Sequence, residues 1–346
     1  MIRVLAWPDY ALEETNNRFT QKSGIKVVCE LFNQNEDAFD RVRSNPARYD
    51  VVFADGHWPT RYLQEQLVQP LEPKKFRNWK GIMPRFKEKC LTIWRAGNDQ
   101  IAAYPGNWGL RGLIWDPSLV SGIDSWNDLW RLPSGHIWIN SQGSEVIAET
   151  GLSLGIPADR IYDLSDPELA NVTRKLTELA PRLGGIWMGY GEIAEAFERS
   201  EAYVAEVDST AIVSNLESTC GKSLESCVPK EGTICWIDGA MVSSGSTVPE
   251  EAVSFIDFLF SPEGTALQWA HSEGYPSANG DALDMLLAES RYASKVTRLL
   301  TDADLVLQST LYRAPRRIEA YQATWRTVLR SVGGRISPQV REALGM

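Results

Sequence analysis

Long apolar runs are absent from this sequence of 346 residues. No stretch approaches the roughly 18 residues that a helix needs to span a bilayer, so the sequence predicts no membrane-spanning helix. Met1 is followed at once by the strand-like segment IRVLAW, and we find no signal peptide. A secreted protein whose leader had been replaced by an initiator methionine would look the same, so this absence decides little.

Histidine and cysteine are scarce, with three and five residues. The cysteines show no metal-ligand spacing with the histidines, and we find no G-x-S-x-G, HExxH or P-loop pattern. We therefore expect no catalysis, no metal and no cofactor. An enzyme on the same architecture is kept as a remote alternative, because a fold does not fix its function. Cys220 and Cys227 lie in a polar loop where a short disulfide or two thiols would both fit.

Positive charge is in deficit, with 35 lysines and arginines against 45 aspartates and glutamates and a net charge of −10. Nucleic-acid binding needs a basic surface, so we expect no nucleic-acid partner. An acidic chain suits a cationic ligand better, although such a balance is common. Aromatic residues are abundant, with 13 tryptophans, 11 tyrosines and 10 phenylalanines. The length exceeds one typical core and predicts two domains.

The order of predicted elements indicates an α/β fold. Residues 2–7, 25–32 and 49–55 read as strands, and the amphipathic segments 11–24 and 35–45 between them read as helices. Strands and helices that alternate at this spacing build a parallel sheet, and ligands bind beyond the carboxyl ends of its strands. Those ends are Trp7 to Tyr10, Asn33 to Asn35 and Asp55 to Trp58.

A second α/β segment follows without a flexible linker. Its predicted strands are 136–142, 202–209 and 234–244, and its predicted helices are 144–155, 167–183 and 248–274, the last with a Ser-Pro-Glu-Gly break. From residue 290 on, the chain reads as mostly helical. If there are two domains, the chain therefore crosses between them in ordered segments.

The strand-like stretch ICWIDGAMV (234–242) contains an acid where the pattern predicts core. A buried carboxylate costs several kcal/mol or more unless it is paired or hydrogen-bonded. Trp236 lies two residues before Asp238 and so shares its face of a strand. The sequence thus raises the question of which positive charge meets Asp238.

A set of ordered signatures resembles the periplasmic polyamine-binding proteins of ABC importers, the spermidine/putrescine type. The signatures are AWPDY (6–10), FTQKSGIKV (19–27), NEDAFDRV (35–42), YDVVFAD (49–55), SWNDLW (125–130), VPKEGTICWIDGAMV (228–242), AVSFIDFLFSPEGTALQ (252–268) and EGYPSAN (273–279). The resemblance covers essentially the whole chain. It implies a type II periplasmic binding protein with two α/β lobes and a ligand cleft between them.

The resemblance also implies the role of the protein. We expect a periplasmic monomer that captures a small amine such as putrescine or spermidine and delivers it to an inner-membrane ABC permease. The expected first lobe comprises residues 1–107 and 238–285, and the second comprises 108–237 and 286–346.

The resemblance assigns several ligand contacts. Trp236 and Asp238 match the aromatic and the acid of a W-x-D strand, Trp7 and Tyr10 match a W-x-x-Y pair, and Asp9 matches an acid that bonds an amine in putrescine-type members. Carboxylates and aromatic faces are the groups that attract alkylammonium ions. Asp238 would then be paired by the ligand; the alternative is a structural acid bound to a backbone donor or an arginine. Trp7 alone could be core.

The remaining candidate residues lie in the second lobe or at positions where the sequence differs from the family. Glu145 matches an acid at a helix start, where an acid also stabilises the helix dipole. Gln142 stands where spermidine binders have a further acid, and Asp208 follows a valine that replaces a family tryptophan. Asp55 and His57 replace a family serine and tyrosine. These changes leave the identity of the amine open.

Arg111 is the departure with most consequence for the ligand, because it replaces a small residue near the crossover between lobes. Its planar fork could clamp a carboxylate, which would favour a zwitterionic amino compound such as 4-aminobutyrate. It could equally be the structural partner of Asp55 or Asp208. The sequence leaves both possibilities open.

Overall fold

The computed structural model describes residues 1–272, 275–290, 292–333, 336 and 341. Residues 273 and 274 of the EGYPSAN signature therefore lie outside the described part. Contacts between residues divide the chain into two units, each formed from two separate stretches of sequence. The first unit is Met1–Trp108 with Trp236–Leu307, and the second is Gly109–Cys235 with Gln308–Met346. The predicted α/β class is confirmed.

The unit boundaries differ from the expected ones mainly at residues 286–307, which we expected in the second lobe. The structure places them in the first unit because they pack on its other residues. The Tyr292 ring meets the Trp269 ring edge-on at 5.6 Å. The Lys89 ammonium donates to the Val306 carbonyl at 2.6 Å. A helical sequence pattern specifies a helix but not the sheet on which it packs.

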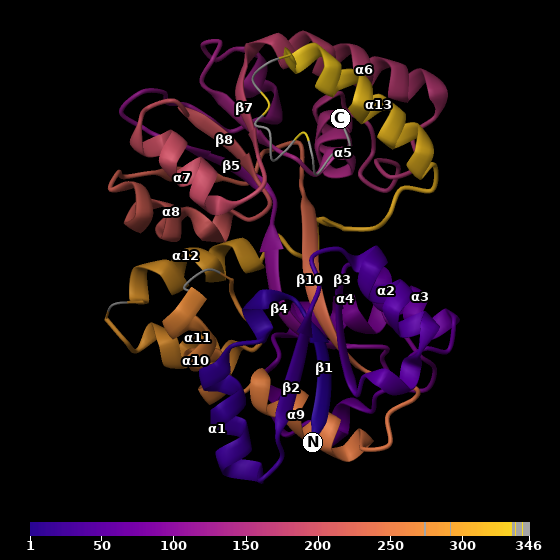
Figure 1. Ribbon diagram of the computed structural model, residues 1–346. Coiled ribbons are helices and arrows are strands. Elements are labelled where there is room, and N and C mark those ends of the chain that lie inside the picture. Colours follow the sequence, from indigo (N-terminus) through magenta and orange to yellow (C-terminus); the bar gives the residue numbers. More distant parts are fainter. Residues whose placement is uncertain (273–274, 291, 334–335, 337–340, 342–346) are drawn as a thin grey trace. The chain divides into compact units, whose positions relative to one another are not determined.

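The first unit is built on a mixed sheet with the strand order β11-β10-β3-β1-β2, and β4 also pairs with β10. The strands are β1 (Ile2–Ala6), β2 (Val27–Leu31), β3 (Val51–Asp55), β4 (Tyr104–Leu110), β10 (Ile234–Val242) and β11 (Thr310–Leu311). As expected from their alternation with helices, β1, β2 and β3 are parallel (Figure 1). β10 runs antiparallel to β3. The first residues of β10, the last residues of β4 and the whole of β11 belong to the second unit.

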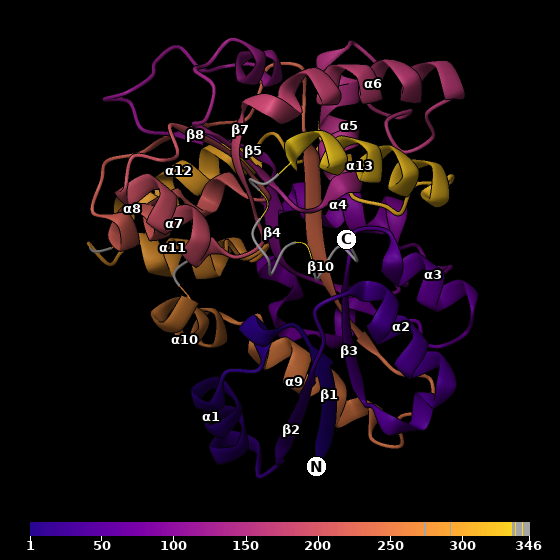
Figure 2. The ribbon, with the colours of Figure 1, turned by 45° about the horizontal axis from the view of Figure 1, so that its top comes forward.

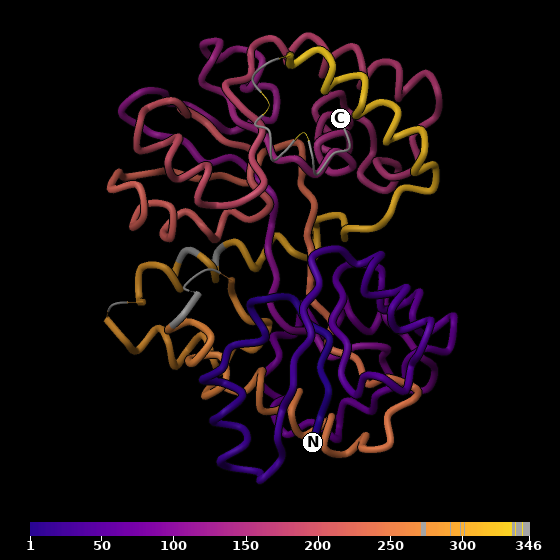
Figure 3. The backbone as a smooth tube through the Cα atoms, in the orientation of Figure 1, coloured from indigo at the N-terminus to yellow at the C-terminus, as the bar shows by residue number. Residues whose placement is uncertain are grey.

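Helices surround this sheet. They are α1 (Glu13–Ser23), α2 (Asn35–Ser44), α3 (Trp58–Gln64), α4 (Pro84–Ile93), α9 (Pro249–Leu259), α10 (Pro262–Ser272), α11 (Gly280–Leu287) and α12 (Ala293–Ala303). α1 ends as predicted at Gly24, whose φ of 74° suits glycine. Figure 3 shows the returning stretch 236–307 running among the N-terminal segments of the same unit. Among the described residues, no helix is long and apolar enough to cross a membrane.

The second unit has a five-stranded sheet with the order β7-β6-β8-β5-β9. Its elements are β5 (Gly112–Trp115), β6 (Ile137–Asn140), β7 (Leu183–Trp187), β8 (Val204–Val207), β9 (Glu225–Cys227), α5 (Gly143–Ser153), α6 (Asp166–Leu179), α7 (Tyr190–Glu198), α8 (Val213–Cys220) and α13 (Ile318–Val332). Figure 2 shows α13 alongside α5 and α6, with which it shares one hydrophobic core. Cys220 and Cys227 are thiols and form no disulfide.

The glycines of α5 give a direct test of this packing. A Cβ on Gly143 would lie 2.2 Å from the Trp325 ring of α13, whereas a Cβ on Gly151 of the same helix would meet only ordinary contacts at 3.7 Å. We expect Gly143→Ala to lower the free energy of unfolding by about 1–3 kcal/mol through overpacking. Gly151→Ala should raise it by about 0.5–1 kcal/mol, because alanine favours the helix. Urea denaturation of both variants measures the difference, and equal effects would contradict the α5–α13 contact.

Candidate functional site

Asp238 and Asp55 face each other across two paired strands. In the antiparallel register of β10 and β3 they are direct partners, with Ala240 opposite Phe53 two residues further along. Side chains directly opposite on such strands share a face, with Cβ atoms roughly 4.5–5.5 Å apart. Asp55 ends β3, whereas Asp238 lies in the middle of the nine-residue β10. We call these two residues the acid pair.

A tyrosine holds one member of the acid pair. The Tyr10 hydroxyl donates to Asp238 Oδ2 at 2.6 Å and accepts from the Asn107 amide at 3.1 Å. Its ring stacks on Phe53 at a centroid distance of 4.4 Å. Tyr10 belongs to a short 3₁₀ turn, Pro8–Tyr10, that follows β1, and the sequence analysis placed it among the ligand contacts. The structure shows that it also orients a carboxylate.

An asparagine holds the other member. The Asn35 Nδ2 atom donates to Asp55 Oδ1 at 2.6 Å, and the Asp55 amide donates to Asn35 Oδ1 at 3.3 Å. Asn35 is the first residue of α2 and is buried. Sequence reasoning placed Asn35 at a strand end but did not assign it a role. The sequence signal that could have pointed to this role is the position of Asn35 after a predicted strand. In the structure that position meets Asp55 at the end of β3.

Both carboxyl groups are held in a setting that disfavours charge. Burial, the facing Asp55 and the nearby Asp9 raise the pKa of Asp238 well above its usual range, against the hydrogen bond from Tyr10. Burial raises the pKa of Asp55 to about 7, against the hydrogen bond from Asn35. Neither residue forms an ion pair with any residue that the structure describes. The protein therefore supplies neutral donors but no cation.

The remaining candidates of the first unit follow β1, follow β3 or lie on β10. Asp9 precedes Tyr10 in the 3₁₀ turn. The Trp7 ring lies 4.2 Å from Phe32, and its indole Nε1 is buried without a hydrogen-bond partner among the described residues. His57 immediately precedes α3. Trp236 is half-buried on the same face of β10 as Asp238.

Arg111 lies in the second unit and is only 2% exposed. Its Nε donates to Glu149 Oε1 at 2.5 Å, one terminal nitrogen donates to Gln142 Oε1 at 2.7 Å, and the other donates to Glu206 Oε1 at 2.6 Å. We call Arg111, Gln142, Glu149 and Glu206 the arginine cluster. Asp55 and Asp208, which the sequence left open as structural partners, do not form these bonds. The partners lie on α5, β8 and the turn before α5.

Arg111 and Gln142 are two of the positions at which the sequence departs from the family. The arginine cluster links them, because the Arg111 guanidinium is hydrogen-bonded to Gln142. Burial disfavours the charged guanidinium, but Glu149 and Glu206 raise the pKa of Arg111 well above its usual value. Burial raises the pKa values of Glu149 and Glu206 against the effect of Arg111. Two buried carboxyl groups thus share one guanidinium. No sequence motif marks Glu149, apart from its spacing of four residues from Glu145, which places both on one helix face.

Glu145 and Asp208 lie near this cluster. Glu145 is buried in the first turn of α5, as the helix-start assignment predicted, and it contributes to the raised pKa of Arg111. Asp208 accepts a hydrogen bond from the Tyr190 hydroxyl at 2.6 Å. Burial raises the pKa of Asp208, and Arg111 opposes that rise. In the second unit, several acids therefore act on the single charge of Arg111.

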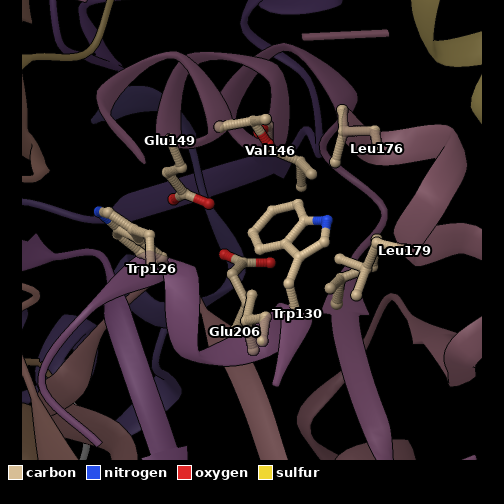
Figure 4. A pocket seen from close by; sticks show the side chains of 10 residues that line it. Trp126, Trp130, Val146, Glu149, Leu176, Leu179 and Glu206 are labelled. Carbon is tan, nitrogen blue, oxygen red and sulfur yellow. The ribbon is translucent and has the colours of Figure 1, made fainter. Parts of the chain in front are cut away.

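A small cavity borders the arginine cluster inside the second unit. Glu149 and Glu206 line it together with apolar side chains that include Trp126, Trp130 and Val146. Figure 4 shows the two carboxylates turned toward each other beside the Trp130 ring. Within the described residues, no group of three or more histidines, cysteines and acids could hold a metal ion. The cavity belongs to the core of the unit.

The comparisons with known proteins give the family. Residues 15–296 match the family described as bacterial extracellular solute-binding protein. The chain belongs to this family. The solute-binding protein is 24% identical over 289 residues to the spermidine/putrescine-binding periplasmic protein of Escherichia coli, covering 82% of this chain and 79% of the relative. It is 22% identical over 319 residues to the putrescine/agmatine-binding protein of Pseudomonas aeruginosa, covering 86% and 84%.

Solved structures share the fold. The spermidine/putrescine ABC transporter substrate-binding protein PotD of Streptococcus pneumoniae superposes with a TM-score of 0.77 at 19% identity, covering 96% of this chain and 99% of that one. A protein described as a GABA receptor has a TM-score of 0.71 at 17% identity, covering 96% and 98%. The predicted two-lobe binding-protein fold and the predicted resemblance are confirmed.

The arginine cluster predicts an asymmetry between its members. Arg111→Met should lower the free energy of unfolding by about 3–5 kcal/mol, because it leaves Glu149 and Glu206 buried without a counter-charge. Glu149→Gln should cost little or stabilise, because it removes one of two carboxylates that share one cation.

Denaturant unfolding of the two variants measures this difference. Arg174→Ala is the matched control, because its ion pair with Glu178 is exposed and such pairs contribute at most about 1 kcal/mol. An Arg111→Met variant as stable as this control would show that the cluster does not need its cation.

Proposed function

We propose that this solute-binding protein captures a small amine of the putrescine class in the periplasm and delivers it to an inner-membrane ABC permease. The observation that carries the proposal is the acid pair. The buried Asp238 and the half-buried Asp55 face each other, and neither has a cationic partner among the described residues. A ligand ammonium is the group that such a pair lacks.

The surroundings of the acid pair support an alkylammonium ligand. Charge-assisted hydrogen bonds from an ammonium to carboxylates are about twice as strong as neutral ones. Asp9 adds a third acid on the turn that carries Tyr10, and its charge acts on Asp238. Trp236 and Trp7 offer aromatic faces, which attract such cations by about 0.5–2 kcal/mol each. We propose Trp7, Asp9, Tyr10, Asp55, Trp236 and Asp238 as ligand contacts of the first unit.

Arg111 does not supply the carboxylate clamp that a zwitterionic ligand would need. Each of its three guanidinium nitrogens donates to an oxygen of the arginine cluster. Detaching the guanidinium would leave Glu149 and Glu206 buried with no counter-charge, at a cost of about 3–5 kcal/mol. We therefore infer an amine without an obligatory carboxylate, and a preference for putrescine over 4-aminobutyrate.

The relatives support the same class of ligand. Those named above are a spermidine/putrescine-binding and a putrescine/agmatine-binding protein, and they are transport proteins and not enzymes. We infer a monomeric carrier that returns its ligand unchanged.

Ligand titration tests the proposal. Putrescine should raise the melting temperature of the wild type and bind in calorimetry, whereas 4-aminobutyrate should bind at least tenfold more weakly. Asp238→Asn should weaken putrescine binding by about 2–5 kcal/mol, roughly 30-fold or more, because one partner of a buried charge pair is lost. Its melting temperature without ligand should be unchanged or raised, because a buried carboxylate without a counter-charge is removed.

Asp124→Asn serves as the control for this titration. Asp124 lies on the surface of the second unit and pairs with Lys230. This variant should bind putrescine as the wild type does. A wild type that ignores putrescine and spermidine but binds 4-aminobutyrate would contradict the proposal, as would an Asp238→Asn variant with unchanged affinity.

A further inference from the structure

We propose that the acid pair holds one proton between its two carboxyl groups when no ligand is bound, and that a primary ammonium group replaces this proton on binding. Ligand capture would then release a proton to solvent. The inference rests on the proposed function and deepens it, because it states how the empty site is neutralised.

The geometry of the strands carries the proposal. Asp55 and Asp238 are direct partners in the register of β3 and β10, and Asp238 is 8% exposed. Two charges at roughly 5 Å in such a setting repel each other by several kcal/mol. Paired carboxyl groups relieve this repulsion when one of them keeps its proton. Because both residues lie on paired strands of the same sheet, the backbone keeps them opposite each other.

Neutralisation of the acid pair also depends on the charged and polar groups that face it. Asp9 in the turn after β1 raises the pKa of Asp238, and Glu36 on α2 raises the pKa of Asp55. Tyr10 and Asn35 are neutral donors. His57, before α3, is a titratable side chain two residues from Asp55. Among these groups, Asp9 and Glu36 add negative charge, and Tyr10 and Asn35 add neutral hydrogen bonds.

Tyr10 and Asn35 act as positioning residues. Their hydrogen bonds occupy Oδ2 of Asp238 and Oδ1 of Asp55. The second oxygen of each carboxyl accepts no side-chain hydrogen bond from the described residues. Each carboxyl therefore keeps one oxygen for the shared proton or for the N–H groups of the ligand. An ammonium has three such donors.

The exchange balances in charge. The singly protonated pair carries a charge of −1; binding of an ammonium breaks one O–H bond, sends that proton to the buffer, and leaves two carboxylates with one bound cation, again −1. A primary ammonium does this most readily, because its three N–H groups can reach both carboxylates. A quaternary ammonium has no N–H to replace the proton.

The exchange fixes the sign of the pH dependence. Below the pH at which the pair gives up its proton, the ligand must displace that proton, so affinity falls tenfold for each unit of pH. Above it, affinity is flat. Because burial and the facing Asp55 raise the pKa of Asp238 well above its usual range, and burial raises the pKa of Asp55 to about 7, this fall in putrescine affinity should extend across neutral pH.

Calorimetry of putrescine binding tests the proposal. At about pH 8, above the pKa of Asp55, titrations in two buffers with different ionisation enthalpies should show the release of close to one proton per putrescine bound. In Asp55→Asn the facing charge is gone and this release should fall, whereas in the surface control Asp124→Asn it should remain. Asn35→Ala removes a hydrogen bond that lowers the pKa of Asp55, so the fall in affinity should begin at higher pH.

The outcomes separate this inference from the proposed function. Putrescine binding with a heat that does not depend on the buffer, and an affinity that is flat between about pH 5 and pH 8, would overturn the proton exchange and leave amine capture standing. Absence of binding by putrescine, spermidine and cadaverine at every pH would overturn both. An Asn35→Ala variant with the pH profile of the wild type would remove the positioning role of Asn35.

Discussion

The first unit depends on two carboxyl groups that the sheet forces together. The register of β10 against β3 places Asp238 opposite Asp55, and the pleat turns both side chains to the same face. Tyr10 and Asn35 then hold one carboxyl each through neutral hydrogen bonds. Most sheets avoid like charges at facing positions because they destabilise the pair.

The second unit meets the same electrostatic problem with a different solution. Glu149 and Glu206 are also buried close to each other, but Arg111 bonds to both. Gln142 occupies the remaining nitrogen of the guanidinium. The arginine cluster is therefore saturated from within the chain. The contrast is informative, because the acid pair of the first unit has no equivalent cation among the described residues.

This contrast bears on how the chain departs from the spermidine/putrescine type. Arg111 and Gln142 looked like two unrelated changes in the sequence, one of them pointing to an anionic group on the ligand. In the structure they are one change, because the Arg111 guanidinium donates a hydrogen bond to Gln142 Oε1. The change at Asp55 is of another kind, because it adds a carboxyl opposite Asp238 at a position where the resemblance to the spermidine/putrescine type implies a serine. The ligand preference should follow the second change more than the first.

Several features could be predicted from the sequence because they are local. The alternation of strands and helices fixed the α/β class, Gly24 ended α1, and the acid within ICWIDGAMV marked Asp238 as a residue in need of a partner. Other features depend on residues far apart in the chain. The facing of Asp238 and Asp55 needs the antiparallel register of β10 and β3, which no local pattern specifies. Tyr10 reaches Asp238 across 228 positions, and Arg111 finds Glu206 across 95. Side-chain chemistry by itself determined that this chain carries acids and aromatics suited to a cation; only the tertiary structure decided which acids are left without a cation, because that depends on which strands become neighbours.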